Sequence, residues 1–170
     1  MRLPVRLAVG ALTVASALGA VGCDLVDFLS LPTQQEANAT ARILETETAC
    51  DDVEVAIASA GGTSNGALST GDCRLGDGSY ADFWLFQTTA TGRVTVEVEA
   101  GGFAPYVGVA PVDLANGETG DGLDDADLDN DGTARIEGTL TAGLWVVFAG
   151  SVAPGETGPY TLRVRRETGV

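Results

Sequence analysis

The chain has 170 residues, a formal net charge of −15 and no histidine, and its nine basic residues are all arginine. Without histidine or lysine it has neither an imidazole base nor an amine for Schiff-base formation, which excludes Ser-His-Asp, Cys-His and lysine-dependent catalysis. Its negative charge makes duplex nucleic acid an implausible partner, because a protein that binds duplex nucleic acid needs clustered positive charge.

Residues 1–22 have the pattern of an export signal. Arg2 and Arg6 precede an apolar run from 7 to 22 that is rich in Ala and Gly and short for a membrane span. The run ends in AVGC, with the cysteine at position 23, and resembles the lipobox of bacterial lipoproteins, where cleavage before the cysteine precedes its diacylation. Ala20 stands where leucine is usual. The alternative is ordinary signal-peptidase cleavage at the same small residues.

Three cysteines, Cys23, Cys50 and Cys73, leave one thiol unexplained in an exported protein unless it is modified. Lipidation of Cys23 uses that thiol, and its two acyl chains would hold the protein on the bacterial cell membrane. The body would then lie on the periplasmic side or at the cell surface. That compartment is oxidising, so Cys50 and Cys73 are predicted to form a disulfide.

Residues 23–48 show no sustained hydrophobic period and few apolar residues after Leu31. They predict a flexible, lipid-anchored tether, with one folded domain over 49–170. Residues 24–42 alone would reach roughly 60 Å when extended and about 25 Å as a coil, which would lift the domain off the membrane. The alternative is one apolar helical turn against the lipid, formed by Leu25, Phe28 and Leu29.

Two strands dominate the domain. The segment 81–87, ADFWLFQ, places Trp84 and Phe86 on one face and apolar residues on the other, which indicates a strand deep in the packing. The segment 93–99, RVTVEVE, alternates strictly, so its three valines should face a core while Thr95, Glu97 and Glu99 face water.

Shorter runs separated by glycine-rich turns predict the remaining strands. They are 53–57, 67–69, 103–109, 134–140, 144–149 and 160–164. A strand in which apolar and polar residues alternate has one solvent-exposed face, and this indicates antiparallel pairing. Together these runs predict an all-β fold, a single antiparallel β-sandwich of jelly-roll-like form.

Six aspartates crowd the segment 121–131, DGLDDADLDND. Asp127, Asp129 and Asp131, followed by glycine, fit the D-x-D-x-D-G opening of a calcium loop, in which alternate carboxylates converge on the ion. The twelfth position is Gly138 rather than glutamate, so a bidentate closing ligand is missing, and Glu137 would need a different geometry. The alternative is a solvated acidic hairpin loop.

Three stretches together resemble the bacterial pre-peptidase C-terminal domain over about residues 66–165. They are GALSTGDCRLGDGSYADFWLF, FAPYVGV and GLWVVFAGSVAPGETGPYTLRV. The shared pattern runs from a G-x-L strand through D-x-aromatic-x-Phe at Asp82 and G-x-aromatic at Gly143 to a closing G-x-Y-T-L around Tyr160. Ala104 departs from the family's usual aspartate, and its Asn-Asp-Asp turn appears here as the longer acidic run.

The resemblance implies a jelly-roll-like sandwich that is non-catalytic, is credited with binding, secretion or solubility roles, and sometimes carries calcium. Trp84 and Trp145 match inward positions of the family pattern, so core packing is favoured over an aromatic sugar platform. Glycoside hydrolysis is disfavoured because the acids concentrate in turns without a predicted cleft. Arg163, Arg165 and Arg166 should form a solvated edge.

We therefore expect a non-catalytic exported lipoprotein whose sandwich binds or scaffolds a protein or polysaccharide. No catalytic residue is assigned, and calcium is the one candidate cofactor. The alternative is a carbohydrate-binding module of the cell envelope, which would need exposed aromatic residues and a groove.

Overall fold

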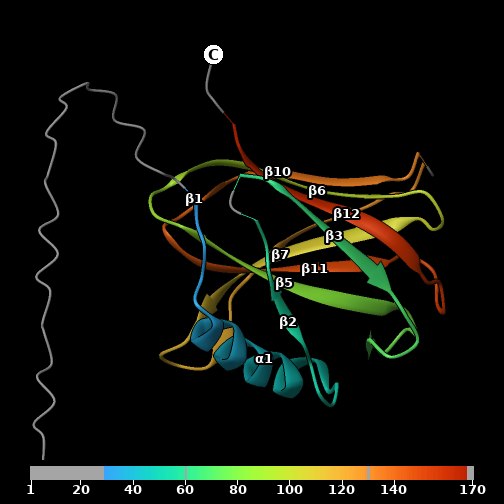
Figure 1. Cartoon of the computed structure of the whole chain (residues 1–170), viewed down its shortest axis with the longest axis horizontal. Coiled ribbons are helices and arrows are strands. Elements are labelled where there is room, and N and C mark those ends of the chain that lie inside the picture. The colour runs from blue at the N-terminus through green and yellow to red at the C-terminus, as the bar shows by residue number, and fades with distance from the viewer. Residues whose placement is uncertain (1–28, 60, 130, 168–170) are drawn as a thin grey trace, which may run out of the picture.

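In a computed structural model, which describes residues 29–59, 61–129 and 131–167, two β-sheets pack face to face and one helix lies outside them (Figure 1). The predicted signal peptide, 1–22, and Cys23 lie outside the described residues. The elements in chain order are β1 Leu29–Ser30, α1 Gln34–Thr48, β2 Val55–Ile57, β3 Thr63–Leu68, β4 Cys73–Arg74, β5 Tyr80–Thr88, β6 Gly92–Ala100, β7 Pro105–Asp113, β8 Glu118–Thr119, β9 Leu123–Ala126, β10 Thr133–Leu140, β11 Gly143–Ser151 and β12 Gly158–Arg166.

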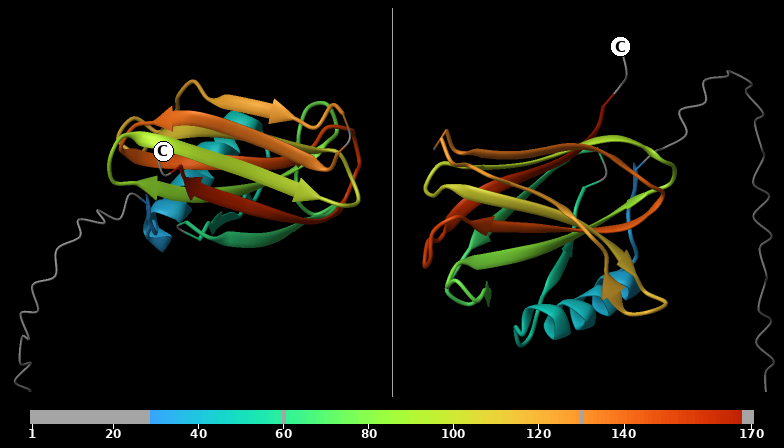
Figure 2. Two further views of the ribbon diagram at one scale, coloured as in Figure 1. Left: turned by 90° about the horizontal axis from the view of Figure 1, so that it is seen from above. Right: turned by 180° about the vertical axis from the view of Figure 1, so that it is seen from behind.

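The larger sheet has eight strands and the smaller has four, and the right view in Figure 2 shows the two layers one above the other. In the large sheet the order is β1-β5-β11-β7-β8, with β2 and β4 also paired to β5 and β9 paired to β7. In the small sheet it is β10-β6-β12-β3. All pairs are antiparallel except β2 with β5. The predicted antiparallel β-sandwich is therefore confirmed.

The main core lies between the sheets and follows the alternation of the strands. In β6, Val94, Val96 and Val98 are at most 1% exposed, as the alternation predicts. In β5, Phe86 belongs to this core, whereas Phe83 and Leu85 pack in a second cluster on the outer face of the large sheet. Because apolar groups occupy both faces of β5, the large sheet needs a cover on its outer side.

That cover is α1, which corrects the prediction of a flexible tether over 23–48. Thr33 caps the helix: its hydroxyl accepts from the Glu36 N–H at 3.2 Å, while the Glu36 carboxylate accepts from the Thr33 N–H at 2.7 Å. This capping box is a sequence signature of a helix start. Ile43 and Leu44 then pack on the large sheet, so the folded domain begins before residue 49. The helix has few apolar residues, and burial against the sheet stabilises it.

Two smaller expectations need correction. Thr95 was expected to face water but is only 4% exposed, and its hydroxyl donates to the Glu167 carboxylate at 3.0 Å. The strand expected from 103 begins at Pro105, and Phe103 packs in the core from the preceding turn. No helix among the described residues is long and apolar enough to cross a membrane.

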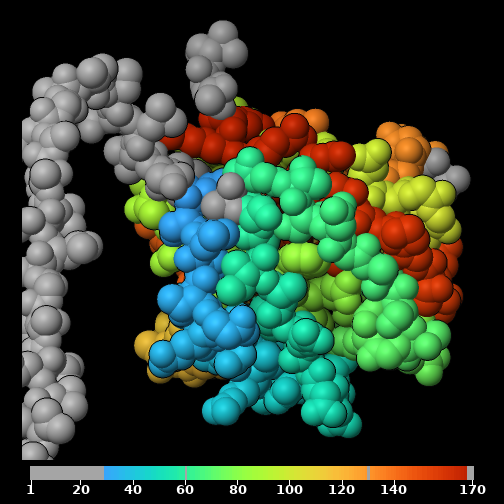
Figure 3. Space-filling model, in the orientation of Figure 1, coloured from blue at the N-terminus to red at the C-terminus, as the bar shows by residue number. Residues whose placement is uncertain are grey.

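The sandwich has two distinct ends. At the end where the described chain begins, which we call the proximal end, Leu29 pairs with Thr88, and the Glu167 N–H donates to the Arg93 carbonyl at 3.1 Å. At the opposite end, which we call the distal end, lie the β6–β7, β9–β10 and β11–β12 loops. Hydrogen bonds link these loops; for example, the Ala100 N–H donates to the Gly132 carbonyl at 2.9 Å. Figure 3 shows the blue start of the described chain and the orange β9–β10 segment on opposite sides of the molecule.

Candidate functional sites

The β9–β10 loop is closed by Asp127, which is 3% exposed. Its carboxylate accepts from the N–H groups of Asp131, at 3.0 Å, and Gly132, at 2.8 Å. Gly132 has φ +85°, and a Cβ on it would lie 2.7 Å from the Ala100 carbonyl oxygen. Only glycine fits both this left-handed conformation and this close approach.

The closed loop brings Asp127, Asp129 and Asp131 together, with one carboxylate oxygen from each within 4.8 Å of the others. Calcium binds oxygens at 2.3–2.6 Å, so oxygens on one ion lie up to about 5 Å apart, and this spacing fits a shared ion. Glu137 does not join them, because it pairs with Arg135. Among its described residues, the loop thus offers three carboxylates and no bidentate closing ligand.

A second site, the aromatic groove, lies on the part of the large sheet's outer face that α1 leaves open. It is a hollow of about 320 Å³ running from the segment after β4, across β5, β11 and β7, to β9. Tyr106 and Phe148 are partly buried there and lie over Gly108, where an added Cβ would be 3.6 and 3.5 Å from their rings. The lining residues are Leu75, Ala81, Tyr106, Gly108, Val109, Ala110, Gly122, Leu123, Asp124 and Phe148.

The polar part of the groove is small. Asp124 is exposed and stands beside Gly108 across the β7–β9 pair. Burial, and then the negative charge of Asp124, raise the pKa of Tyr106, so its phenol stays a neutral donor. The groove therefore combines aromatic surface with one hydroxyl and one carboxylate, a combination suited to a neutral ligand that carries hydroxyl groups.

The two tryptophans lie elsewhere. Trp145 is 8% exposed and donates to the Thr141 carbonyl at 3.1 Å, while the Trp84 indole donates to the Tyr160 hydroxyl at 2.7 Å. Both pack in or against the core between the sheets, so neither forms a sugar platform.

Three of the residues that carry the family resemblance, Asp82, Trp84 and Tyr160, form one partly buried hydrogen-bond network. The Tyr160 hydroxyl donates to Asp82 at 2.6 Å and accepts from Trp84. A Cβ on Gly66 would lie 2.3 Å from the Tyr160 ring, so glycine is needed for that ring to pack over β3. Burial raises the pKa of Asp82 to about 6, with further contributions from the nearby acids Asp72 and Glu54, while the Tyr160 hydrogen bond opposes the shift.

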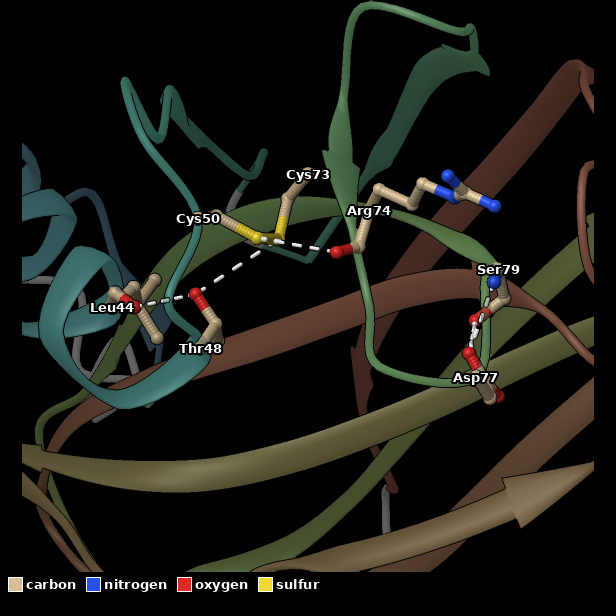
Figure 4. The surroundings of a disulfide bond; sticks show 7 residues. All are labelled: Leu44, Thr48, Cys50, Cys73, Arg74, Asp77 and Ser79. Carbon is tan, nitrogen blue, oxygen red and sulfur yellow. Dashed lines mark hydrogen bonds between the residues drawn. A yellow bond between two sulfur atoms is a disulfide. The ribbon is translucent and has the colours of Figure 1, made fainter.

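The structure contains the predicted disulfide between Cys50 and Cys73, whose Cα atoms are 5.5 Å apart (Figure 4). It links the end of α1 to β4, next to a turn in which Asp77 accepts from the N–H and hydroxyl of Ser79. These two bonds lower the pKa of Asp77. The bridge thus fixes the helix beside the large sheet.

The geometry brings together the three predicted calcium ligands and the two predicted disulfide cysteines, while Cys23 lies outside the described residues. Tyr106, Phe148 and Asp124 were not singled out from the sequence. An alternating strand over 103–109 places Tyr106 on a face, but only the position of α1 decides that this face stays open.

The fold is a β-sandwich like that of a pre-peptidase C-terminal domain. No family model matches the chain, and no curated protein matches it. Among solved structures it is similar to the pre-peptidase C-terminal domain of a collagenase from Bacillus anthracis, at 15% identity and a TM-score of 0.52. That match covers 67% of this chain and 97% of the other. The predicted resemblance in fold is thereby confirmed.

Proposed function

We propose that this chain is an exported lipoprotein, anchored by an acylated Cys23, whose sandwich is a non-catalytic binding module of the cell envelope. The observation that carries the anchoring is the pairing of Cys50 with Cys73, which leaves Cys23 as the one cysteine outside the disulfide. The non-catalytic role is supported by the fold shared with a domain appended to a collagenase.

The anchoring is tested by mass spectrometry of the N-terminal peptide and by membrane fractionation of a Cys23→Ala variant. We expect acyl mass on Cys23 and transfer of the variant to the soluble fraction. Cys50→Ala with Cys73→Ala serves as the control, because it removes two cysteines without touching the anchor. A native protein without acyl mass, or a variant that stays on the membrane, contradicts the anchoring.

We further propose that Asp127, Asp129 and Asp131 bind calcium. Three carboxylates within 4.8 Å support the ion, and the missing closing glutamate limits affinity to about 10⁻⁴ to 10⁻³ M, the range of extracellular modules. Since an ion that binds only the folded state stabilises it, millimolar calcium should raise the melting temperature.

In the variant Asp129→Asn with Asp131→Asn this calcium response should vanish, while Asp113→Asn, in the β7–β8 segment, should retain it. Asp127 is left intact because it closes the loop. No calcium heat in calorimetry and no change in melting up to about 10 mM, ten times the weakest expected constant, would leave the segment a solvated acidic loop.

A second candidate function is carbohydrate binding, and the aromatic groove favours it. A pyranose ring stacking on Tyr106 and Phe148 would bring its hydroxyl groups to Asp124 and to the Tyr106 phenol. A glycan array separates this function from protein binding. Tyr106→Ala with Phe148→Ala should abolish any signal, whereas Leu114→Ala, which removes an exposed apolar residue (39%) elsewhere, should not. An array without any signal contradicts carbohydrate binding.

A further inference from the structure

The small sheet ends on one side at β3, which pairs with β12 and with no other described strand. β3 spans six residues, TSNGAL, without a charged residue or a proline. The other sheet edges are built differently. In the large sheet the outermost strands have two to four residues, and β8 and β9 carry Glu118, Asp124 and Asp125. On β10, the Arg135 N–H donates to the Asp125 carboxylate at 2.7 Å. Short length and charge keep a sheet edge from pairing with another chain, and β3 has neither protection.

The direction of the backbone groups of β3 follows from the neighbouring strands. The Glu167 N–H donates to the Arg93 carbonyl, so odd-numbered residues of the last strand point to β6 and even-numbered residues of β12 point to β3. In the β12–β3 register, even-numbered residues of β3 face even-numbered residues of β12. The odd-numbered residues of β3 therefore point their N–H and C=O groups away from the sheet; they are Thr63, Asn65 and Ala67.

This outer edge of β3 is open. Thr63, Asn65 and Ala67 are exposed, and among the described residues no hydrogen bond reaches their backbone groups from another segment. Figure 3 shows the blue-green atoms of β3 on the surface that faces the viewer. Because unpaired N–H and C=O groups in a row form a template for another strand, the edge can extend the small sheet by one strand.

A second copy of β3 fits this edge because the pattern is self-complementary. In an antiparallel pair centred on Asn65, each Asn65 lies opposite its copy, and Thr63 lies opposite Ala67 of the other chain. All three pairs are then of the hydrogen-bonded type, which gives about six hydrogen bonds. The side chains that meet are small and uncharged, so neither bulk nor charge opposes this pairing.

The distribution of charge also favours this edge. The strands of the small sheet, together with Glu167, hold five arginines and four glutamates, whereas the rest of the described chain holds two arginines and 18 acidic residues. Two copies of so acidic a protein repel each other over most of their surfaces. The repulsion is smallest where the two nearly neutral small sheets meet.

We infer that two copies of this chain pair through β3, which joins their small sheets into one continuous sheet with four strands from each copy. Strands of six residues bury less area than a standard interface, so the dimer is weak and depends on concentration. The two-fold axis of such a pair is perpendicular to the sheet, which places both aromatic grooves on the same side of the dimer. If the groove binds carbohydrate as proposed, a long polysaccharide reaches both grooves and gains avidity.

Sedimentation equilibrium of the full chain, in detergent matched in density to the solvent, measures the protein mass whether or not Cys23 is acylated. We expect the mass to rise from one chain to two with concentration. High salt should favour the dimer, since it screens the repulsion between the copies. A single-chain mass at every concentration up to about 1 mM overturns the pairing and leaves the edge for an extended segment of another protein.

Charge variants test the register. Asn65→Lys and Asn65→Glu each place like charges opposite one another, about 5.5 Å apart between Cα atoms, so each variant alone should remain monomeric. A one-to-one mixture should dimerise again, because opposite charges then meet, and this recovery also shows that both variants fold. Asn116→Lys, the same change at an exposed turn between β7 and β8, should dimerise like the native chain.

A backbone variant tests the hydrogen bonds themselves. Asn65→Pro removes one outward N–H and leaves the bonds to β12 intact, so it should also be monomeric, whereas Asn65→Ala should still dimerise. Dimers of Asn65→Lys or Asn65→Pro alone, or a mixture of the two charge variants that stays monomeric, overturn the pairing through β3.

Discussion

The two outer faces of the sandwich differ in the kind of side chain that they carry: one is mainly apolar and the other mainly charged. On the large sheet, β5, β7 and β11 carry apolar groups on their outer side, and α1 buries part of that side under Ile43 and Leu44. On the small sheet, β6, β10 and β12 carry arginine and glutamate outward, and Glu97 lies between Arg135 and Arg163 from the two neighbouring strands. One face therefore depends on burial and the other on solvated ion pairs, so they should respond very differently to mutation.

The largest effect is expected under the helix. Leu44 is fully buried between α1 and the large sheet. Leu44→Ala should lower the free energy of unfolding by about 2–5 kcal/mol, since it removes apolar contacts and leaves a cavity. Denaturant titration measures the change, with the exposed Leu31→Ala as control. A loss below about 1 kcal/mol would mean that α1 adds little to the large sheet.

The second-largest loss of stability is expected on the same face, when the disulfide is removed. Because it closes a loop of 23 residues, its removal in Cys50→Ala with Cys73→Ala should lower the free energy of unfolding by roughly 3 kcal/mol. Hydrogen exchange should then show faster opening of α1 than of β6, because the bridge fixes the helix and not the small sheet. Uniform acceleration in both elements would contradict this local role.

A smaller effect concerns pH. Asp82 holds its proton up to about pH 6 in the folded protein, whereas the unfolded chain releases it near pH 4. Its contribution to stability is therefore complete below pH 4 and is lost as the pH rises through 6. The loss should be about 1 kcal/mol, because solvent screens this partly exposed group.

Asp82→Asn should flatten that part of the stability profile and still accept the Tyr160 hydrogen bond. Urea titrations between pH 4 and 7 measure it, with Asp51→Asn at an exposed position as control. An unchanged slope in Asp82→Asn would assign the pH dependence to other groups.

The smallest effect is expected on the ion-paired face. Glu97→Gln removes the carboxylate that Arg135, Arg163 and Arg165 share. The Glu97 side chain is only 12% exposed, but the three arginines are 30–51% exposed, so solvent screens each pair and its worth is about 0–1 kcal/mol. We expect a loss of about 1 kcal/mol at low salt that shrinks at high salt. A loss comparable with that of Leu44→Ala would make this face as dependent on its contacts as the large sheet.

The sequence predicted what depends on local alternation and on spacing within one loop. Valines at every second position of β6 predicted its buried face, and D-x-D-x-D-G predicted three converging carboxylates. It missed α1, although Thr33 and Glu36 carry a capping-box signature, because the helix has too few apolar residues to show a period. The aromatic groove was missed as well, since its walls come from strands far apart in the chain.

By itself, then, the sequence determined the six long strands, the two-sided apolar character of β5 and the cysteine pairing, because these follow from periodicity and residue counts within short segments. The short strands β1, β4, β8 and β9 were not predicted. Only the tertiary structure decided that α1 covers part of the large sheet and leaves Tyr106 and Phe148 open, and that Arg163 of β12 lies beside Glu97 of β6. Those arrangements depend on the order of strands in each sheet and on the seating of the helix, which are set by packing between distant segments rather than by any local pattern.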